Sequence, residues 1–459
     1  MANCWPFLSF SILYSFLSVI RHNHFQSQGI DFSIYDQALW LYSKFERPFS
    51  TVTFLHDLAD RFRPIMLPLS TLYWFSSNEK ILLVFQSIIL SAAVFPIWLL
   101  AKRWLPSTAA ILIAFLYVDF VGIQATTVAD FHEVALLPFF LAWLFYFLKK
   151  ERWREYFIVL VICLSVRKHV GLMLAILGLY IFITKKNPQV ALATFIISLV
   201  WSSTAIFMIM PKLGQQDYSS FVEPGDTIGR AILGYLGNPL FAIKNFFWPL
   251  EKAQTLFWSF FSFGLVPLGY LALLPVSLFQ FASRFLDLQH PIRWTIYYQY
   301  SAELAVLLAI STIYGAKRIL SKFDKMSLAF LVFFLLATHA VTNITLHSPL
   351  KNLLKPQFWR QEPWMNDTRL ILSMVPPEAS VAAQNNLLPH LSHRRQIYLI
   401  PNNRNADYMI LDLHPGQNDW NFYAGNLEAA KVYFKQQVKE SFYKPIASAG
   451  DAYLLKRQD

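Results

Sequence analysis

Long runs of apolar residues alternate with short polar and charged segments along most of this chain. Helices are the predicted structure for these runs, because a span in lipid must satisfy its backbone hydrogen bonds within itself, over about 20 residues. The predicted membrane-embedded segments are 4–20, 81–100, 108–123, 134–148, 156–166, 172–183, 190–210, 302–314 and 328–341. With shorter and broken runs included, we expect roughly ten to twelve such segments.

Two apolar stretches do not fit a simple span. The stretch ending at Phe75 is too short to cross comfortably and is predicted to be interfacial or re-entrant. The run 257–281 is interrupted by Pro267, Gly269 and Pro275, so we predict two half-helices forming a hairpin that is buried against protein.

The pattern changes after about residue 345. Short strand-like runs at 380–383, 398–400, 408–413 and 452–455 surround a helical pattern at 427–438. Strands that alternate with helical segments indicate a small α/β domain. The chain is therefore predicted to be an α-helical polytopic membrane protein, with a multi-spanning domain 1–345 and a C-terminal domain 346–459.

Composition agrees with the pattern. Of 459 residues, 55% are hydrophobic, 17% aromatic and only 15% charged, against about 25% charged in a soluble domain. Cys4 and Cys163 both lie in apolar runs and indicate neither a disulfide framework nor a zinc site. The net charge of +11 is not a nucleic-acid signal, because much of it sits in short clusters between apolar runs.

Those basic clusters predict the orientation. The clusters 102–103, 149–154, 185–186 and 317–325 share one side if the runs alternate, and that side is the cytoplasm by the positive-inside rule. The long first loop 21–79, the loop 211–255 and the C-terminal domain are then extracytoplasmic. We expect a multi-pass protein of a bacterial inner (plasma) membrane.

Two carboxylates, Asp31 and Asp36, stand in the first outer loop. Asp31 is a candidate cap of a short helix from Phe32 to Tyr42, or a general base acting on a substrate at the lipid interface. On one helix the two carboxylates would lie roughly 140° apart. One is then expected to face a cavity while the other braces the loop, and we favour Asp31 as the base.

Asp130, His132 and Glu133 lie together at the mouth of a predicted span. One interpretation is a helix N-terminus in which Asp130 is the cap and the acidic groups are favoured by the dipole. The other is that Asp130 and His132 serve as acid, base or metal ligand, although Asp-Xaa-His is a weak ligand spacing.

Cationic and aromatic groups are predicted to gather on the same face. They are candidates for binding a phosphate or pyrophosphate, to which a guanidinium offers a fork of donors; the alternatives are snorkelling cations and an ordinary aromatic belt. No predicted span carries the mid-bilayer charge of a proton relay. The candidates are Arg61, Arg63, Arg167, Lys168, His169, His290 and Tyr300.

The stretch Asp31-Phe32-Ser33-Ile34-Tyr35-Asp36-Gln37-Ala38-Leu39-Trp40 resembles the hallmark of the domain of unknown function 2079 family of bacterial multi-spanning proteins. The resemblance continues at 60–64, 130–132, 170–172, 300–302 and 380–393. That family resembles the C-type (GT-C fold) glycosyltransferases, which take a sugar from a polyprenyl-phosphate carrier and bear a catalytic aspartate in the first outer loop. The resemblance implies that Asp31 or Asp36 is the base.

The chain also departs from that family's pattern. Lys-Glu-Asp usually precedes Val-Gly-Leu, whereas this chain has Arg167-Lys168-His169, and Arg61 and Arg63 stand where a histidine and a serine are expected. The site is therefore predicted to be unusually cationic, which implies either a different substrate or an inactive member.

The leading hypothesis is glycosyl transfer from a polyprenyl-phosphate sugar at the outer face, with membrane lipid as a partner. A lipid or polysaccharide transporter or flippase, which needs no catalytic base, is the alternative, and a non-catalytic assembly subunit is a third. The sequence leaves open the sugar, the acceptor, the oligomeric state and the cofactor, for which a divalent cation is a candidate.

Overall fold

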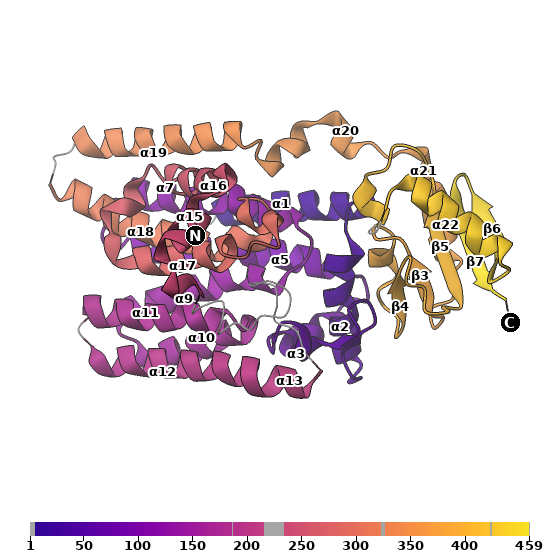
Figure 1. The fold of residues 1–459 in the computed structure, drawn as a ribbon. Coiled ribbons are helices and arrows are strands. Elements are labelled where there is room, and N and C mark those ends of the chain that lie inside the picture. The colour runs from indigo at the N-terminus through magenta and orange to yellow at the C-terminus, as the bar shows by residue number, and fades with distance from the viewer. Residues whose placement is uncertain (1–4, 186, 215–233, 323–325, 423–424, 459) are drawn as a thin grey trace.

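Helices form the chain as far as Thr345, and a mixed α/β part follows at one end of the helical body (Figure 1). The structure is a computed structural model that describes residues 5–185, 187–214, 234–322, 326–422 and 425–458. Parts of the predicted basic clusters, Lys186 and 323–325, and residues 215–233 of the loop 211–255 lie outside the described residues.

The long helices lie side by side along a common direction (Figure 1). Neighbours in sequence often pack as antiparallel pairs, as α9 with α10 and α11 with α12. The helices of the body are α1 (Trp5–Asn23), α5 (Lys80–Ala92), α6 (Val94–Ala101), α7 (Ser107–Val118), α8 (Val121–Val128), α9 (Leu137–Lys150), α10 (Trp153–Val166), α11 (Val170–Lys185), α12 (Pro188–Thr204), α13 (Met210–Lys212), α15 (Pro239–Phe247), α16 (Leu250–Phe261), α17 (Leu274–Phe285), α18 (Ala302–Leu320) and α19 (Met326–Thr345).

Four stretches of the described chain are long and apolar enough to cross a membrane: Lys80–Ala101, Ser107–Val128, Pro188–Lys212 and Leu328–Thr345. Val170–Thr184 and Leu271–Phe285 are apolar but shorter. The first two spans were predicted as single helices, and each is two helices in the structure: α5 and α6 meet at Ala93, and α7 and α8 are separated at 119–120. Hydropathy alone could not show these interruptions, because the segments on both sides are apolar.

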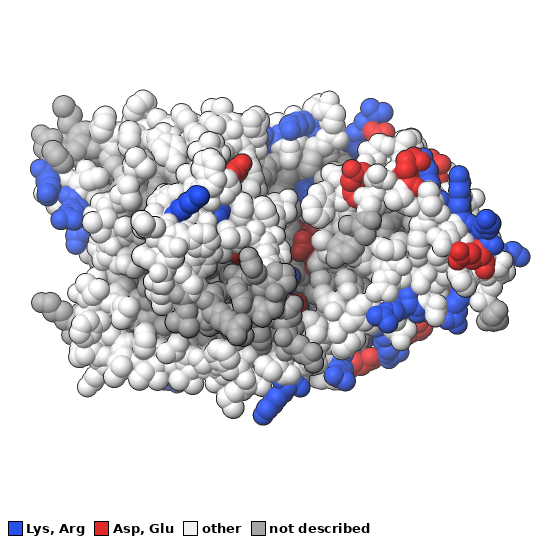
Figure 2. All heavy atoms as spheres, viewed as in Figure 1, with Lys and Arg blue, Asp and Glu red and all other residues white. Residues whose placement is uncertain are grey.

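The outer surface of the body is apolar. Phe330 and Phe333 on α19 and Leu192 and Val200 on α12 are exposed. Such contiguous apolar surface is rare on soluble monomers and is what lipid tails contact. In Figure 2 most of the body is free of charged atoms, which gather over the C-terminal part and at the opposite tip.

Helix α18 is the centre of the body. Every residue from Ala302 to Ala316 is buried, and the helix contacts α6, α7, α8, α9 and α17. A helix that is buried all round needs apolar residues on every face, which explains why most residues of this segment are apolar. Its N-terminus carries Glu303, a buried carboxylate.

The predicted break in 257–281 is confirmed. Helix α16 ends at Phe261, two 3₁₀ turns follow (Val266–Gly269 and Leu271–Leu273), and α17 begins at Leu274. Gly315 of α18 packs against the turn: a Cβ added there would lie 2.2 Å from the carbonyl oxygen of Val266. The broken backbone is thus covered by protein, as lipid requires.

The predicted short helix from Phe32 to Tyr42 is present as α2 (Ile34–Ser43), and the rest of the first loop is more ordered than its sequence pattern predicted. The loop contains a π-helical turn η1 (Gly29–Ser33), helix α2 and a short β1–β2 pair (Phe49–Ser50 with Leu55–His56). Two short helices, α3 (Asp57–Asp60) and α4 (Met66–Leu69), and a 3₁₀ turn η2 (Ser70–Trp74) complete it. Elements of two to five residues leave too little periodicity to be recognised in a sequence.

The C-terminal part is a mixed five-stranded sheet of order β4-β3-β5-β7-β6. Strand β3 pairs parallel with β4 and β5, whereas β7 pairs antiparallel with β5 and β6. Helix α21 (Pro363–Ser373) packs on one face and α22 (Leu427–Lys439) on the other. The strands are β3 (Val381–Ala383), β4 (Ile397–Leu399), β5 (Tyr408–Asp412), β6 (Tyr443–Ala449) and β7 (Ala452–Arg457).

The first loop docks on this sheet. Phe25 is buried in the same apolar cluster as Val381 and Ile410. The Thr51 hydroxyl donates to the Ile397 carbonyl (2.6 Å) and accepts from the Ile397 amide (2.9 Å), so a side chain of the loop bonds to the backbone of the edge strand β4. The C-terminal part therefore holds the first loop in place.

Candidate functional site

Asp31 and His132 form the centre of the candidate site. The Oδ1 atom of Asp31 lies 3.4 Å from Nε2 of His132, and the two side chains are 38% and 1% exposed. The His132 amide donates to the side-chain oxygen of Gln86 (2.9 Å), and its ring meets the edge of the Tyr35 ring. A partly open carboxylate thus stands in front of a fully buried imidazole.

The backbone around Asp31 is fixed from two sides. The Gly29 amide donates to the Asn385 carbonyl (2.6 Å), and the Ile30 amide donates to the Asn385 side chain (3.0 Å). The Gln28 amide donates to the Asp130 carboxylate (2.9 Å). This network replaces the helix capping that the sequence suggested: neither Asp31 nor Asp130 caps a helix through its side chain.

Asp36 lies elsewhere. Its side chain is fully buried, and its Oδ1 atom accepts from the Tyr73 hydroxyl and from Nε2 of His393 (3.2 Å). The different partners of Asp31 and Asp36 agree with the expectation that the two carboxylates do not share a face.

Tyr35 and Glu133 organise the cationic groups. The guanidinium of Arg63 lies 4.2 Å from the centre of the Tyr35 ring and its Nε donates to Asp57 (2.6 Å). Its Nη1 is 3.9 Å from Oε2 of Glu133. Arg63 is 1% exposed, so it lies behind the surface of the site rather than on it.

Arg61 and Arg167 lie nearer to solvent. Both donate to the Tyr35 hydroxyl, Arg167 over 3.1 Å, and Arg167 also donates to Glu133. Their side chains are 30% and 14% exposed. Each of these arginines is held by specific acceptors within the protein, whereas a snorkelling cation keeps its charged head in water.

The charges decide the protonation of the acidic groups. Burial raises the pKa of Glu133, but Arg167, Arg63 and Arg61 outweigh it and hold the pKa well below its usual range. Glu133 is therefore the ionised counter-charge of the three neighbouring guanidinium groups.

Neighbouring charges lower the pKa of Asp31 as they lower that of Glu133. Burial alone raises its pKa, but the hydrogen bond and charge of His132, with Arg61 and Arg167, bring the pKa below the ordinary value. Asp31 is therefore a carboxylate at neutral pH.

Lys168 directly follows Arg167 in the chain. Burial lowers its pKa to about 8. Its backbone is fixed between the Arg61 carbonyl (3.5 Å) and the Ser202 hydroxyl (2.6 Å). The glycine of the Val-Gly-Leu motif is required here, since a Cβ on Gly171 would lie 2.1 Å from the Ser202 oxygen.

The chain as a whole matches one family profile. The profile described as "Predicted membrane protein (DUF2079)" covers residues 21–443. The chain belongs to the DUF2079 family. It is a membrane protein, in agreement with its apolar helices. A search of curated proteins finds no significant match.

The fold of this DUF2079 protein is that of the GT-C glycosyltransferases. The crystal structure of ArnT from Cupriavidus metallidurans in the apo state superposes with a TM-score of 0.55 over 98% of this chain and 96% of that chain, at 10% identity. ArnT bound to undecaprenyl phosphate superposes with a TM-score of 0.50 over 99% and 98%, also at 10% identity. At this identity the likeness concerns the fold.

The remaining predicted residues contact groups outside the Asp31–His132 pair. Nε2 of His169 lies 3.3 Å from Oε1 of Glu303. His290 pairs with Asp287 in its own loop (3.1 Å), and the Tyr300 ring packs near Tyr298. The predicted Asp130-Xaa-His132 metal spacing does not form a shared site, because Asp130 binds the Gln28 amide and His132 faces Asp31.

Sequence reasoning missed Tyr35 and Glu133 as site residues. Both stand inside motifs that the sequence analysis quoted. Their role depends on distant arginines: Arg61 is 26 residues from Tyr35, and Arg167 is 34 residues from Glu133. Arg284 was missed as well: it is buried at the end of α17, donates to Ser301 (3.2 Å), and keeps two side-chain nitrogens without a hydrogen-bond partner in the described structure.

Proposed function

We propose that this DUF2079 protein is a glycosyltransferase that takes a sugar from a polyprenyl-phosphate carrier at the outer face of the plasma membrane. The observation that carries the proposal is the open, ionised Asp31 carboxylate beside Arg61 and Arg167. The shared fold with ArnT, whose structure holds undecaprenyl phosphate, supports a lipid-phosphate donor.

In the proposed reaction an acceptor hydroxyl oxygen attacks the anomeric carbon of the sugar. The bond from that carbon to the phosphate oxygen breaks, and the polyprenyl phosphate leaves with the electron pair. Asp31 accepts the hydroxyl proton as the bond forms. Arg61 and Arg167 donate to the departing phosphate, with Lys168 as a further cation, because charge develops on those oxygens.

The deeper groups position this set. Arg63 and Glu133 lie behind Arg167 and fix its direction, and Asp36 ties α2 to the C-terminal part. Asp130 accepts from the Gln28 amide and so holds the backbone that precedes Asp31 in the chain. We propose 1–345 as the membrane domain and 346–459 as an extracytoplasmic domain that keeps the catalytic loop in place.

The test uses the full chain in lipid nanodiscs with a radiolabelled polyprenyl-phosphate sugar and its acceptor. Asp31→Asn is expected to lower transfer by about a hundredfold or more while donor binding persists, because the amide cannot accept the proton. Asp451→Asn, the same change at an exposed position of the sheet domain, is the control.

Equal transfer by the wild type and Asp31→Asn would contradict the proposal. Lipid movement across a vesicle membrane that is insensitive to Asp31→Asn would instead favour the transporter hypothesis, which needs no base.

A further inference from the structure

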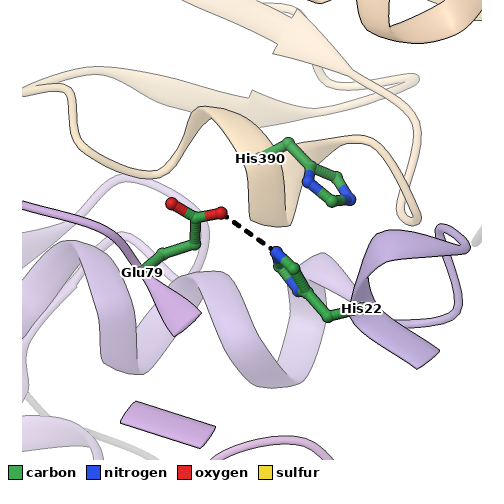
Figure 3. A group of neighbouring side chains, drawn as sticks. All are labelled: His22, Glu79 and His390. Carbon is green, nitrogen blue, oxygen red and sulfur yellow. Dashed lines mark hydrogen bonds and ion pairs between the residues drawn. The ribbon is translucent and has the colours of Figure 1, made fainter. Parts of the chain in front are cut away.

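Three side chains with metal-ligating atoms converge away from Asp31, where the first loop meets the C-terminal part (Figure 3). His22 lies at the end of α1, Glu79 directly precedes α5, and His390 lies in the 3₁₀ turn η11 (Leu388–Leu391) of the C-terminal part. One ligand atom from each lies within 4.8 Å of the other two.

We propose that His22, Glu79 and His390 bind one zinc-like divalent metal ion that joins the C-terminal domain to the helical body. Two imidazoles and one carboxylate are a ligand set that zinc uses, with water in the fourth position. The proposed reaction gives none of these residues a role, and only His390 lies within a stretch that carries the family resemblance.

The distances fit such a site. Nε2 of His22 is 3.2 Å from Oε1 of Glu79. Two ligands about 2.0–2.1 Å from a tetrahedral zinc lie about 3.3 Å apart, so this pair already has the required separation. All three ligand atoms lie within 4.8 Å of one another, so no separation needs to shorten by more than about 1.5 Å, which side-chain rotations can supply.

The hydrogen bonds also fit. Nδ1 of His22 bonds to the Ser27 hydroxyl (3.1 Å), which orients the ring with Nε2 toward Glu79. Metal-binding imidazoles are usually held in this way through their other nitrogen. Nε2 of His390 is buried without a hydrogen-bond partner in the described structure, and a buried nitrogen of this kind is expected to have one.

An ordinary apolar contact explains these observations less well. The His22 and His390 rings lie 4.3 Å apart, and Phe25 lies 4.6 Å from His390 on its other flank. Ring packing accounts for burial of the imidazoles but leaves the His390 nitrogen unused. A metal ion bound through this nitrogen would satisfy it and would neutralise the Glu79 charge.

A metal ion bound by His22, Glu79 and His390 would also affect the loop that bears Asp31. His22 and Asp31 are nine residues apart, and the segment between them also bonds to Asn385, five residues before His390. A metal at this cluster would hold both ends of that segment to the same turn of the C-terminal domain. Its removal is expected to loosen the loop that bears Asp31.

The test is metal content of the full chain in detergent, stripped with a chelator, dialysed against zinc and desalted. We expect about one zinc per wild-type chain. His390→Gln and Glu79→Gln should each lose it. Two controls should retain it: His347→Gln removes an exposed imidazole elsewhere, and Arg395→Gln breaks a different contact between the same two parts, with Glu46.

A second measurement needs no variant. Zinc should raise the thermal unfolding midpoint of the stripped wild type, and cobalt in place of zinc should give the visible absorption of a tetrahedral site. A wild type that retains no zinc, or zinc retained equally by His390→Gln and Glu79→Gln, would overturn the proposal and identify the cluster as a hydrogen-bonded contact.

Discussion

Glu133 is the residue on which the cationic side of the site depends. It is fully buried, and its two oxygens face Arg167 and Arg63, while both Arg61 and Arg167 reach the Tyr35 hydroxyl. Without this carboxylate, buried guanidinium groups would lose a main counter-charge, which is costly in a low-dielectric environment.

Glu133→Gln should therefore destabilise the protein by about 3 kcal/mol, because it keeps the shape of the side chain and removes its charge. The thermal unfolding midpoint in detergent is the measurement. Glu428→Gln removes a carboxylate that is 77% exposed and pairs with Lys431, so its effect should stay within about 0.5 kcal/mol. Equal midpoints for the two variants would show that Glu133 is not needed as a counter-charge.

The sequence could identify which residue types gather at the site but not how they are layered. Asp31, Arg61 and Arg167 were predicted as members from motif and charge alone. Arg63 lies buried behind them because it packs on the Tyr35 ring. The sequence pattern does not reveal this contact. Asp36 and His393 meet across 357 residues, so only the fold brings them together.

At the scale of elements, α2 is held between the helical body and the C-terminal part. Asp36 on α2 accepts from Tyr73 of η2 and from His393, and Trp40 stacks on the His393 ring at 6.0 Å. Since α2 follows the Asp31 turn directly, this contact also limits movement of the site.

The His393 contact should make stability depend on pH. Burial lowers the pKa of His393, but the charge and hydrogen bond of Asp36, with the charge of Glu79, raise it above the ordinary value in spite of Arg394. A raised pKa in the folded state means that the contribution is full below the unfolded pKa, about 6.5, and is lost as the pH rises through the folded pKa.

The difference in unfolding midpoint between the wild type and His393→Gln should accordingly be largest at about pH 5.5 and shrink toward about pH 9. A difference that is constant over this range, or that grows with pH, would contradict the assigned ion pair.

Element prediction succeeded where periodicity was sustained and failed where it was not. The apolar runs at 190–210 and 328–341 became α12 with its continuation and α19, and β3, β4, β5, β7 and α22 lie where predicted. Strand β6 was missed because most of its residues face solvent and Pro445 interrupts its pattern.

For the whole molecule, the fold places the sheet at one end of a body whose sides are apolar (Figures 1 and 2). The C-terminal end of α18 carries Lys317 and Arg318. In the proposed topology this end lies on the opposite side of the membrane from the sheet domain. From the basic clusters we propose, by the positive-inside rule, that this end is cytoplasmic.

Cysteine labelling checks this topology. In a variant with Cys4 and Cys163 replaced by alanine, Glu428→Cys should react with an impermeant thiol reagent in intact spheroplasts. Ser321→Cys should react only after the membrane is opened. Both positions are exposed, so accessibility within the protein does not bias the comparison. The reverse pattern would place the candidate site on the cytoplasmic face and contradict the outer-face proposal.

The central claim is that a lipid-linked phosphate binds beside Asp31. An experimental structure of the full chain with a bound polyprenyl phosphate tests it most directly. The account predicts phosphate density within hydrogen-bonding distance, about 3 Å, of Arg61 and Arg167, with Asp31 facing the same space. Phosphate density away from residues 31–63 and 167–168, with Arg61 and Arg167 still bound only to Tyr35 and Glu133, would contradict it.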